Sequence, residues 1–444
     1  MPGYKKAFEI RVEHLIPGYA VPSPQGEGLD IDYYREDTSS VTFGDTFSSR
    51  RRLGKAMNIT NTDKEYVAGT YGRFPLEIER GHGAKLWDTE GKEYIDLGAG
   101  IAVNTFGYSD DVWAAAVKKQ VDKLQHTSNL YYTEPCARLA KLLCEKTGMK
   151  KVFFSNSGAE ANECAIKVAR KYAFLKNGDE EKSNIITLKN SFHGRTVTTL
   201  AATGQDAFHT DFGPFPDGFD YCEANNVEQL RSMVETGEFC AVMMETVQGE
   251  GGVNVLTEEF VKTAQSLCRE NDMLLIFDEV QTGNGRTGKL YSYMHYGVQP
   301  DVVSTAKGLA GGLPMGATML SEKVENVLTP GSHGSTFGGN PVCAAGAISI
   351  IERLDDELLC SVCEKEQLIR EKLSKCKNVK EITGRGLMLG IECEKAGKDV
   401  ANAALAAGVL VLTAKNKVRL VPPLNISESE LCKALEILAD IIDS

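Results

Sequence analysis

The sequence has no long apolar run and no excess of positive charge. No stretch of its 444 residues approaches the roughly 20 consecutive apolar residues that a membrane-spanning helix needs, so we do not expect a membrane protein. Lysine and arginine number 49 against 61 aspartate and glutamate residues, which gives a formal net charge of −12. Proteins that hold nucleic-acid phosphates or anionic membrane surfaces usually carry a basic patch or excess. The charge therefore disfavours both kinds of partner.

Paired metal-binding cysteines are also scarce. Among the twelve cysteines only Cys360 and Cys363 form a C-x-x-C pair, and neither a second pair nor nearby histidines completes a zinc site. We therefore expect no metal. Dispersed cysteines in apolar stretches, such as Cys144 and Cys240, are typical of reduced thiols that pack like small apolar side chains. They predict a reduced, intracellular and cytoplasmic protein.

The first 56 residues lack the regular apolar pattern of the rest of the chain. They hold four of the fourteen prolines, and their eight basic residues are balanced by eight acidic ones. A mitochondrial transit peptide is poor in acidic residues, and no apolar signal-peptide core is present either. We interpret residues 1–69 as an N-terminal extension and arm, in which Met57 could serve as an alternative start.

From about Thr70 onward, short apolar segments alternate with helical patterns. This alternation predicts an α/β fold with a large, mostly parallel sheet between helices. The expected strands are 152–154, 185–188, 241–245, 274–277 and 302–304, and the expected long helices are 158–175 and 258–271. We expect residues 70–339 to form this large domain, whose first strands contribute to the small domain. Residues 340–444 should form a smaller α+β domain.

A small-residue turn after the first of these strands marks a candidate anion site. The segment SNSGAE at 155–160 opens the helix expected at 158–175. Free N–H groups and the positive end of the helix dipole favour anions at such a position. Ser157 can add a hydroxyl group, and Gly158 lets a phosphate approach the backbone. The same residues would also suit an ordinary N-cap.

An acidic residue follows another expected strand. Four apolar residues at 274–277 lead to Asp278, and open α/β sheets place their ligands at such carboxyl ends. The segment 283–289 has the spacing of a P-loop. However, Leu290 follows Lys289 where Mg²⁺ binding requires Ser or Thr, and a P-loop needs its own preceding strand. We therefore reject an NTPase.

A lysine and an aromatic residue also follow expected strands. Lys307 lies after the strand at 302–304, and a lysine among apolar neighbours can act as a nucleophile that forms Schiff bases. Most lysines at strand ends are simply solvated. Phe192 could stack on an aromatic ring, and Arg195 could hold a carboxylate with two hydrogen bonds. A phosphate cup, a stacking ring, a carboxylate and a lysine on one sheet suit pyridoxal phosphate, whose ring nitrogen the carboxylate would keep protonated.

The order and spacing of these motifs resemble the class III aminotransferases, which are fold type I pyridoxal-phosphate enzymes. The resemblance covers roughly residues 70–437 and rests on FDEVQTGNGRTG at 277–288 followed by AKGL at 306–309. It implies a homodimer in which Lys307 is the catalytic, cofactor-bound lysine. The cofactor contacts that it implies are Ser157, Gly158 and Ala159 at the phosphate, Phe192 and Val280 on the ring faces, Asp278 at the ring nitrogen, Gln281 at the phenolic oxygen, and Thr336 of the partner subunit at the phosphate.

Other segments resemble the family members that act on acetylornithine: TYGRFP at 70–75, GIAVN at 100–104 and HTSNLYY at 126–132. By that likeness Arg195 binds the substrate α-carboxylate, and Tyr71 and Ser335 belong to the substrate site. Glu250 would pair with Arg385 until a dicarboxylate substrate frees the arginine.

The implied reaction moves the δ-amino group of N2-acetyl-L-ornithine to 2-oxoglutarate, within arginine biosynthesis. Gly100 stands where ornithine aminotransferases carry an aromatic residue, which disfavours that activity. Succinylornithine, ornithine and 4-aminobutyrate stay open as amino donors. A pyridoxal-phosphate decarboxylase or racemase, and a non-catalytic protein that kept the fold, also stay open.

Overall fold

The computed structural model describes residues 58–178 and 180–444, so most of the predicted N-terminal extension and the alternative start at Met57 lie outside the described residues. The contacts divide the chain into two units, residues 1–68 and 69–444. In the first unit, helix α1 (Ile59–Tyr66) begins at Asn58, whose side chain accepts a hydrogen bond from Asn61 N at 2.8 Å. No helix of the described part of the chain is long and apolar enough to cross a membrane.

A seven-stranded sheet forms the centre of the second unit, in the order β4-β12-β11-β10-β7-β5-β6. Its strands are β4 (Lys151–Ser155), β5 (Asn184–Leu188), β6 (Phe219–Cys222), β7 (Phe239–Met244), β10 (Leu274–Asp278), β11 (Val302–Thr305) and β12 (Gly316–Leu320). Strand β12 runs antiparallel to both of its neighbours, and the other pairs are parallel. The mostly parallel sheet confirms the predicted fold class, although the apolar pattern did not mark β6 or β12.

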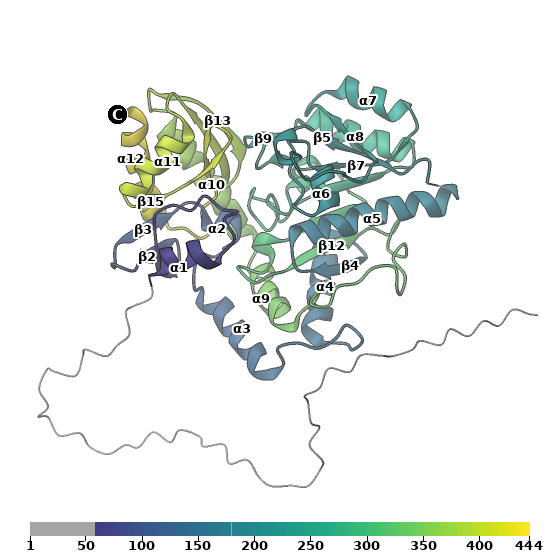
Figure 1. Cartoon of the computed structure of the whole chain (residues 1–444), viewed down its shortest axis with the longest axis horizontal. Coiled ribbons are helices and arrows are strands. Elements are labelled where there is room, and N and C mark those ends of the chain that lie inside the picture. The colour runs from purple at the N-terminus through teal and green to yellow at the C-terminus, as the bar shows by residue number, and fades with distance from the viewer. Residues whose placement is uncertain (1–57, 179) are drawn as a thin grey trace, which may run out of the picture. The chain divides into compact units, whose positions relative to one another are not determined.

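Helices cover both faces of this sheet (Figure 1). Those that contact its strands are α4 (Glu134–Thr147), α5 (Gly158–Asn177), α6 (Val197–Ala202) and α8 (Glu258–Glu270). Helix α7 (Val227–Glu235) packs on α8, and α3 (Asp111–Lys123) packs on α9 (Pro341–Ile351). Along β10, Leu274 and Ile276 pack in the apolar cluster of α5, whereas Leu275 and Phe277 pack in that of α8. Because successive side chains of a strand point to opposite faces, a strand covered on both faces must be apolar throughout. This explains the continuous apolar run at 274–277.

The C-terminal elements build smaller sheets, and Figure 1 shows their helices gathered together. The helices are α10 (Asp356–Leu373), α11 (Gly397–Ala406) and α12 (Glu428–Asp443), and the antiparallel sheet contains β13 (Val379–Arg385), β14 (Met388–Cys393), β17 (Lys417–Leu420) and β16 (Leu412–Ala414). Strand β15 (Val409–Leu410) pairs with β3 (Glu93–Asp96), which continues through β2 (Lys85–Asp88) to β1 (Ile78–His82). Helix α9 packs against α3 and α4. The domain boundary at residue 340 stays a prediction.

Several short elements connect the main strands and helices. They are the turn α2 (Ala99–Ala102), the paired strands β8 (Val247–Gln248) and β9 (Asn254–Val255), and the 3₁₀ segments η2 (Asp206–Phe208), η3 (Ser292–Tyr296) and η4 (Lys307–Leu309). Segment η4 begins at Lys307 and contacts α2. The segments that follow the strands therefore bring the predicted site residues to one edge of the sheet.

A buried carboxylate fixes the loop that follows β10. Glu279 accepts hydrogen bonds from Thr282 Oγ1 at 2.7 Å, Ser292 N at 2.9 Å and Tyr293 N at 2.7 Å. Burial raises the pKa of Glu279 to about 7, although these donors lower it in part. The folded protein therefore binds this proton more tightly than the unfolded chain. The resulting contribution to stability is complete below the ordinary pKa of 4.5 and is lost as the pH rises through about 7.

We predict that Glu279→Gln makes the stability of the cofactor-free protein less dependent on pH. The amide cannot ionise, so the variant should lose roughly 3 kcal/mol less of its unfolding free energy than the wild type between about pH 5 and about pH 8. It should be less stable at low pH, because the amide accepts fewer hydrogen bonds. Thermal unfolding at several pH values measures both effects, with the exposed Glu259→Gln as control. Equal pH dependence in the wild type and Glu279→Gln would contradict the assignment.

Candidate active site

A cavity of about 580 Å³ opens at the carboxyl ends of the strands of the large sheet. Residues from the segments after β4, β5, β7, β10 and β11 line it together. The predicted site residues that it brings together are Tyr71, Ser157, Gly158, Ala159, Phe192, Arg195, Asp278, Val280, Gln281 and Lys307. Ligands bind at this edge in open α/β sheets, because loops there project side chains into a common crevice.

The N-terminus of α5 forms one wall of the cavity. Ser157 is its N-cap, and the Ser157 hydroxyl accepts a hydrogen bond from Glu160 N at 3.2 Å. The first N–H groups of a helix have no partner within the helix, so they can bind an anion. A Cβ atom on Gly158 would lie 2.6 Å from Val280 Cγ1, which leaves no room for a side chain. Glycine at this position therefore lets the first turn of α5 pack closely against Val280.

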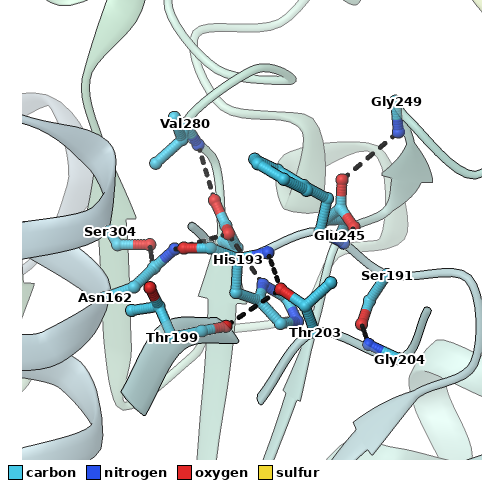
Figure 2. A network of polar contacts seen from close by, with 12 residues as sticks. Asn162, Ser191, His193, Thr199, Thr203, Gly204, Glu245, Gly249, Val280 and Ser304 are labelled. Atoms are coloured by element: carbon cyan, nitrogen blue, oxygen red, sulfur yellow. Dashed lines mark hydrogen bonds and ion pairs between the residues drawn. The ribbon is translucent and has the colours of Figure 1, made fainter. Parts of the chain in front are cut away.

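Three donors fix the Asp278 carboxylate at the end of β10. Its Oδ2 accepts from Asn162 Nδ2 at 2.7 Å and is 2.8 Å from His193 Nδ1, while its Oδ1 accepts from Val280 N at 3.0 Å. Figure 2 shows Asn162 and His193 on either side of this network, with Ser304 bonded to Asn162. Burial alone would lower the pKa of His193, but the hydrogen bond to Asp278 and the charges of Asp278 and Glu245 together outweigh burial, so that pKa is raised. The carboxylate is therefore held in one orientation inside the cavity.

A second buried carboxylate connects two loops of the site. Glu245 Oε1 accepts from Phe192 N at 2.9 Å, and its Oε2 accepts from Gly249 N at 3.2 Å (Figure 2). Burial raises the pKa of Glu245. These two bonds tie the backbone of the predicted ring-stacking residue to the loop that carries Glu250.

Lys307 lies in the cavity wall in a strained backbone conformation. Its φ is +45°, which is uncommon for a residue with a side chain and is found mainly where the surroundings enforce it. The neighbouring peptides are held by Asn284 Nδ2, which donates to Ala306 O at 3.1 Å, and by Thr105 Oγ1, which donates to Gly308 O at 2.8 Å. Burial lowers the pKa of Lys307, although Asp278 and the other nearby carboxylates oppose this. A lowered pKa favours the neutral, nucleophilic amine.

The predicted pairing of Glu250 with Arg385 is wrong. Glu250 Oε1 lies 2.6 Å from Arg419 Nη1, and the same nitrogen donates to Gly249 O at 3.0 Å and to Gln281 Oε1 at 3.2 Å. Burial alone would raise the pKa of Glu250, but Arg419, together with Lys307 and Gln281, outweighs burial, so the pKa is lowered. The Arg385 guanidinium instead lies over the ring of Tyr296, 5.1 Å from its centroid.

The position of each arginine in its strand explains this difference. Arg385 is the last residue of β13, whereas Arg419 lies within β17 and is 3% exposed. A charged residue inside an apolar strand is rarely buried without a partner. The apolar run around Arg419 (VRLVPPL at 418–424) was therefore a usable signal. Asn162 and Glu245 were also missed. For Asn162 the comparable signal was a polar side chain on the buried face of α5.

The remaining predicted residues lie at or beyond the rim of the cavity. Thr336 is exposed and is not part of the cavity lining. Ser335 Oγ accepts from Asn156 Nδ2 at 3.1 Å, so it contacts the segment before α5. Tyr71 is 74% exposed, and Arg195 is exposed although it lines the cavity.

The chemistry of this lining fits pyridoxal phosphate. A helix N-terminus suits the phosphate, and a fixed buried carboxylate suits a protonated ring nitrogen. Among the described residues, none forms a hydrogen bond with Lys307 Nζ, so the amine is available for covalent bonding.

Comparison with known proteins agrees with this fit. The family described as aminotransferase class-III matches residues 66–442. Acetylornithine aminotransferase of Haemophilus ducreyi is 48% identical over 386 residues, which cover 86% of this chain and 98% of that protein. Succinylornithine transaminase of Salmonella paratyphi A is 44% identical and covers 84% of this chain and 94% of its own.

A solved structure shows the same fold. The ornithine aminotransferase from Toxoplasma gondii, whose active site is partly occupied by pyridoxal phosphate, superposes with a TM-score of 0.83 at 33% identity. The superposition covers 88% of this chain and 95% of that one. The chain therefore belongs to the class-III aminotransferases and is a pyridoxal-phosphate-dependent transaminase.

Proposed function

We propose that the protein transfers the δ-amino group of N2-acetyl-L-ornithine to 2-oxoglutarate, which gives N-acetyl-L-glutamate 5-semialdehyde and L-glutamate in arginine biosynthesis. The observation that carries the proposal is the ion pair between Glu250 and Arg419 beside the cavity, because one site must accept two chemically different substrates. The 48% identity to an acetylornithine aminotransferase supports this donor. A cytoplasmic location is part of the proposal, since all twelve cysteines are free thiols, and cell fractionation would test it.

In this reaction Lys307 does the covalent and proton-transfer work. Pyridoxal phosphate, when bound, takes up the amino group and supplies an electron sink. Lys307 Nζ would bind the cofactor, be displaced from it by the amino group of the substrate, and as a free amine then accept the proton from the substrate carbon that carries the amino group. Its lowered pKa suits this role, because a general base must be neutral near the working pH. Asp278 would stabilise the proton on the ring nitrogen.

The other site residues would orient the cofactor and the substrates. The phosphate would lie at Ser157, Gly158 and Ala159, the ring between Phe192 and Val280, and the phenolic oxygen at Gln281. Arg195 would hold the α-carboxylate, and Tyr71 and Ser335 would contact the substrate.

The ion pair gives a physical basis for alternating substrates. With the amino donor bound, Glu250 neutralises Arg419 and keeps an unpaired positive charge away from the uncharged acyl end. With 2-oxoglutarate bound, a substrate carboxylate would replace Glu250 as the partner of Arg419. Because an unpaired buried charge is costly, the arginine exchanges one carboxylate for another and is never left alone.

The proposal is tested with a panel of amino donors and 2-oxoglutarate as acceptor. We expect kcat/KM for N2-acetyl-L-ornithine to exceed the values for ornithine and 4-aminobutyrate by about tenfold or more, since the site must recognise the acyl group. N2-succinyl-L-ornithine is included because of the succinylornithine relative, and its ratio to the acetyl compound measures acyl tolerance. A preference for 4-aminobutyrate would contradict the proposed donor.

The correction of the arginine gives a second prediction with a matched control. Arg419→Lys should raise the KM for 2-oxoglutarate about tenfold or more, because lysine cannot form two parallel hydrogen bonds with a carboxylate. Arg385→Lys should leave this KM within about twofold, since Arg385 packs on Tyr296. Steady-state kinetics with thermal unfolding of both variants separates recognition from stability. A larger rise of the KM for 2-oxoglutarate in Arg385→Lys than in Arg419→Lys would instead identify Arg385 as the arginine that binds the substrate carboxylate.

We also propose a homodimer in which Thr336 of the partner subunit completes each phosphate site. An exposed apolar patch supports this: Leu130 is 86%, Tyr131 69% and Phe337 60% exposed. Asn129 Nδ2 donates to Ser335 O at 2.9 Å and so joins the two segments of the patch beside Thr336. Large exposed apolar patches are typical of protein interfaces.

Subunit mixing tests this arrangement. Lys307→Ala and Thr336→Asp should each nearly abolish turnover, the second because its carboxylate repels the phosphate. In a mixed dimer, one site would contain Lys307 from one subunit and Thr336 from the other, whereas the second site would carry both substitutions. Because about half of the dimers in an equal mixture are mixed, the mixture should recover about a quarter of the wild-type activity. A mixture that stays inactive after subunit exchange, or a monomer in light scattering, would overturn the proposal.

A further inference from the structure

Arg195 is positioned in an unusual way for a residue proposed to bind a carboxylate. No residue of the described chain forms a hydrogen bond or ion pair with its guanidinium group. Instead the guanidinium carbon lies 4.3 Å from the ring centroid of Phe208 and 5.6 Å from that of Phe192. A contact with the face of an aromatic ring uses no hydrogen-bond acceptor, so it leaves the N–H groups of the guanidinium available for a ligand.

Phe208 is the nearer ring, and it also contacts the other one. The rings of Phe208 and Phe192 are 5.7 Å apart and meet edge to face at 73°. Phe208 therefore touches both the predicted ring-stacking residue and the predicted carboxylate-binding residue. It does not line the cavity itself.

The short segment that carries Phe208 is held on both sides. Phe208 ends the 3₁₀ segment η2, and Phe208 N donates to Gln205 O at 3.0 Å. Gln205 Nε2 donates to Ser191 O at 2.9 Å, directly before Phe192, and His209 Nε2 lies 2.8 Å from Leu200 O. The ring of Phe208 consequently has a fixed platform, whereas an exposed arginine without partners would sample many rotamers.

We propose that Phe208 is a positioning residue for carboxylate recognition, which orients the Arg195 guanidinium through its ring face. This inference rests on the proposed role of Arg195 in substrate binding. Fixing the guanidinium before the ligand arrives reduces the entropy lost on binding. Using an aromatic ring for this purpose keeps every N–H donor of Arg195 for the substrate, whereas an acidic partner would compete with the substrate carboxylate.

The test compares Phe208→Leu with the wild-type holoenzyme. Leucine keeps an apolar side chain but removes the ring, so the dissociation constant for succinate, an unreactive dicarboxylate, should rise about two- to fivefold in calorimetry. The KM for 2-oxoglutarate should rise by a similar factor, while kcat and the visible absorption of the cofactor stay unchanged. Phe208→Tyr keeps the ring and should restore wild-type binding.

Two further variants decide whether the effect passes through Arg195. Phe212→Leu, at an exposed aromatic residue of the same loop, serves as the matched control and should bind succinate like the wild type. In an Arg195→Gln background, Phe208→Leu should have no further effect on succinate binding. Additive effects would overturn the inference, as would unchanged succinate binding in Phe208→Leu.

The outcomes also separate this inference from the proposed reaction. If Phe208→Leu lowers thermal stability, Phe208→Met provides a second side chain without a ring. Succinate binding that does not depend on Arg195 would overturn the inference whatever the amino donor is. Loss of the expected donor preference, with succinate binding still dependent on Arg195 and Phe208, would contradict only the assigned substrate.

Discussion

The fixed carboxylate of Asp278 is the constraint around which the site is built. It lies at the end of the fully buried strand β10 and receives donors from α5, from the loop after β5 and from its own loop. An unpaired carboxylate in this interior would cost several kcal/mol, so these donors are required by burial itself. Because they come from three elements, correct packing of α5 on the sheet and correct orientation of Asp278 depend on each other.

The same low-dielectric interior makes charge pairing the basis of substrate exchange. Glu250, Glu245 and Asp278 all oppose the lowering of the Lys307 pKa by burial, whereas Arg419 adds to that lowering. Moving Glu250 away from Arg419 would leave the arginine without its carboxylate partner and would also change the pKa of Lys307. Removing one partner of a buried pair typically costs about 3–5 kcal/mol, so exchange needs an incoming carboxylate. The net charge of −12 carries no information about this local arrangement.

The sequence predicted those helices and strands whose own apolar pattern is clear. The continuous apolar run at 274–277 is required by burial on both faces, and the helix expected at 158–175 became α5 (Gly158–Asn177). Strand β6 was missed because it is an edge strand in which only Cys222 is buried, so its residues do not form an apolar run. Strand β12 was missed because it directly follows a glycine-rich segment at 308–316, which is typical of a loop. Both are recognised only once neighbouring strands supply hydrogen bonds.

The choice between Arg385 and Arg419 shows where such prediction ends. Both arginines lie in strands of one antiparallel sheet, and local sequence gives each a plausible route to Glu250. The register decides: Arg419 stands opposite Gly390 in the centre of the sheet, whereas Arg385 stands opposite Met388 at the end of β13. A shift of one residue would turn every side chain of β17 to the other face, so the apolar neighbours of Arg419 fix its direction. Charge recognition at this site therefore depends on the packing of Val418 and Leu420 as much as on the arginine itself.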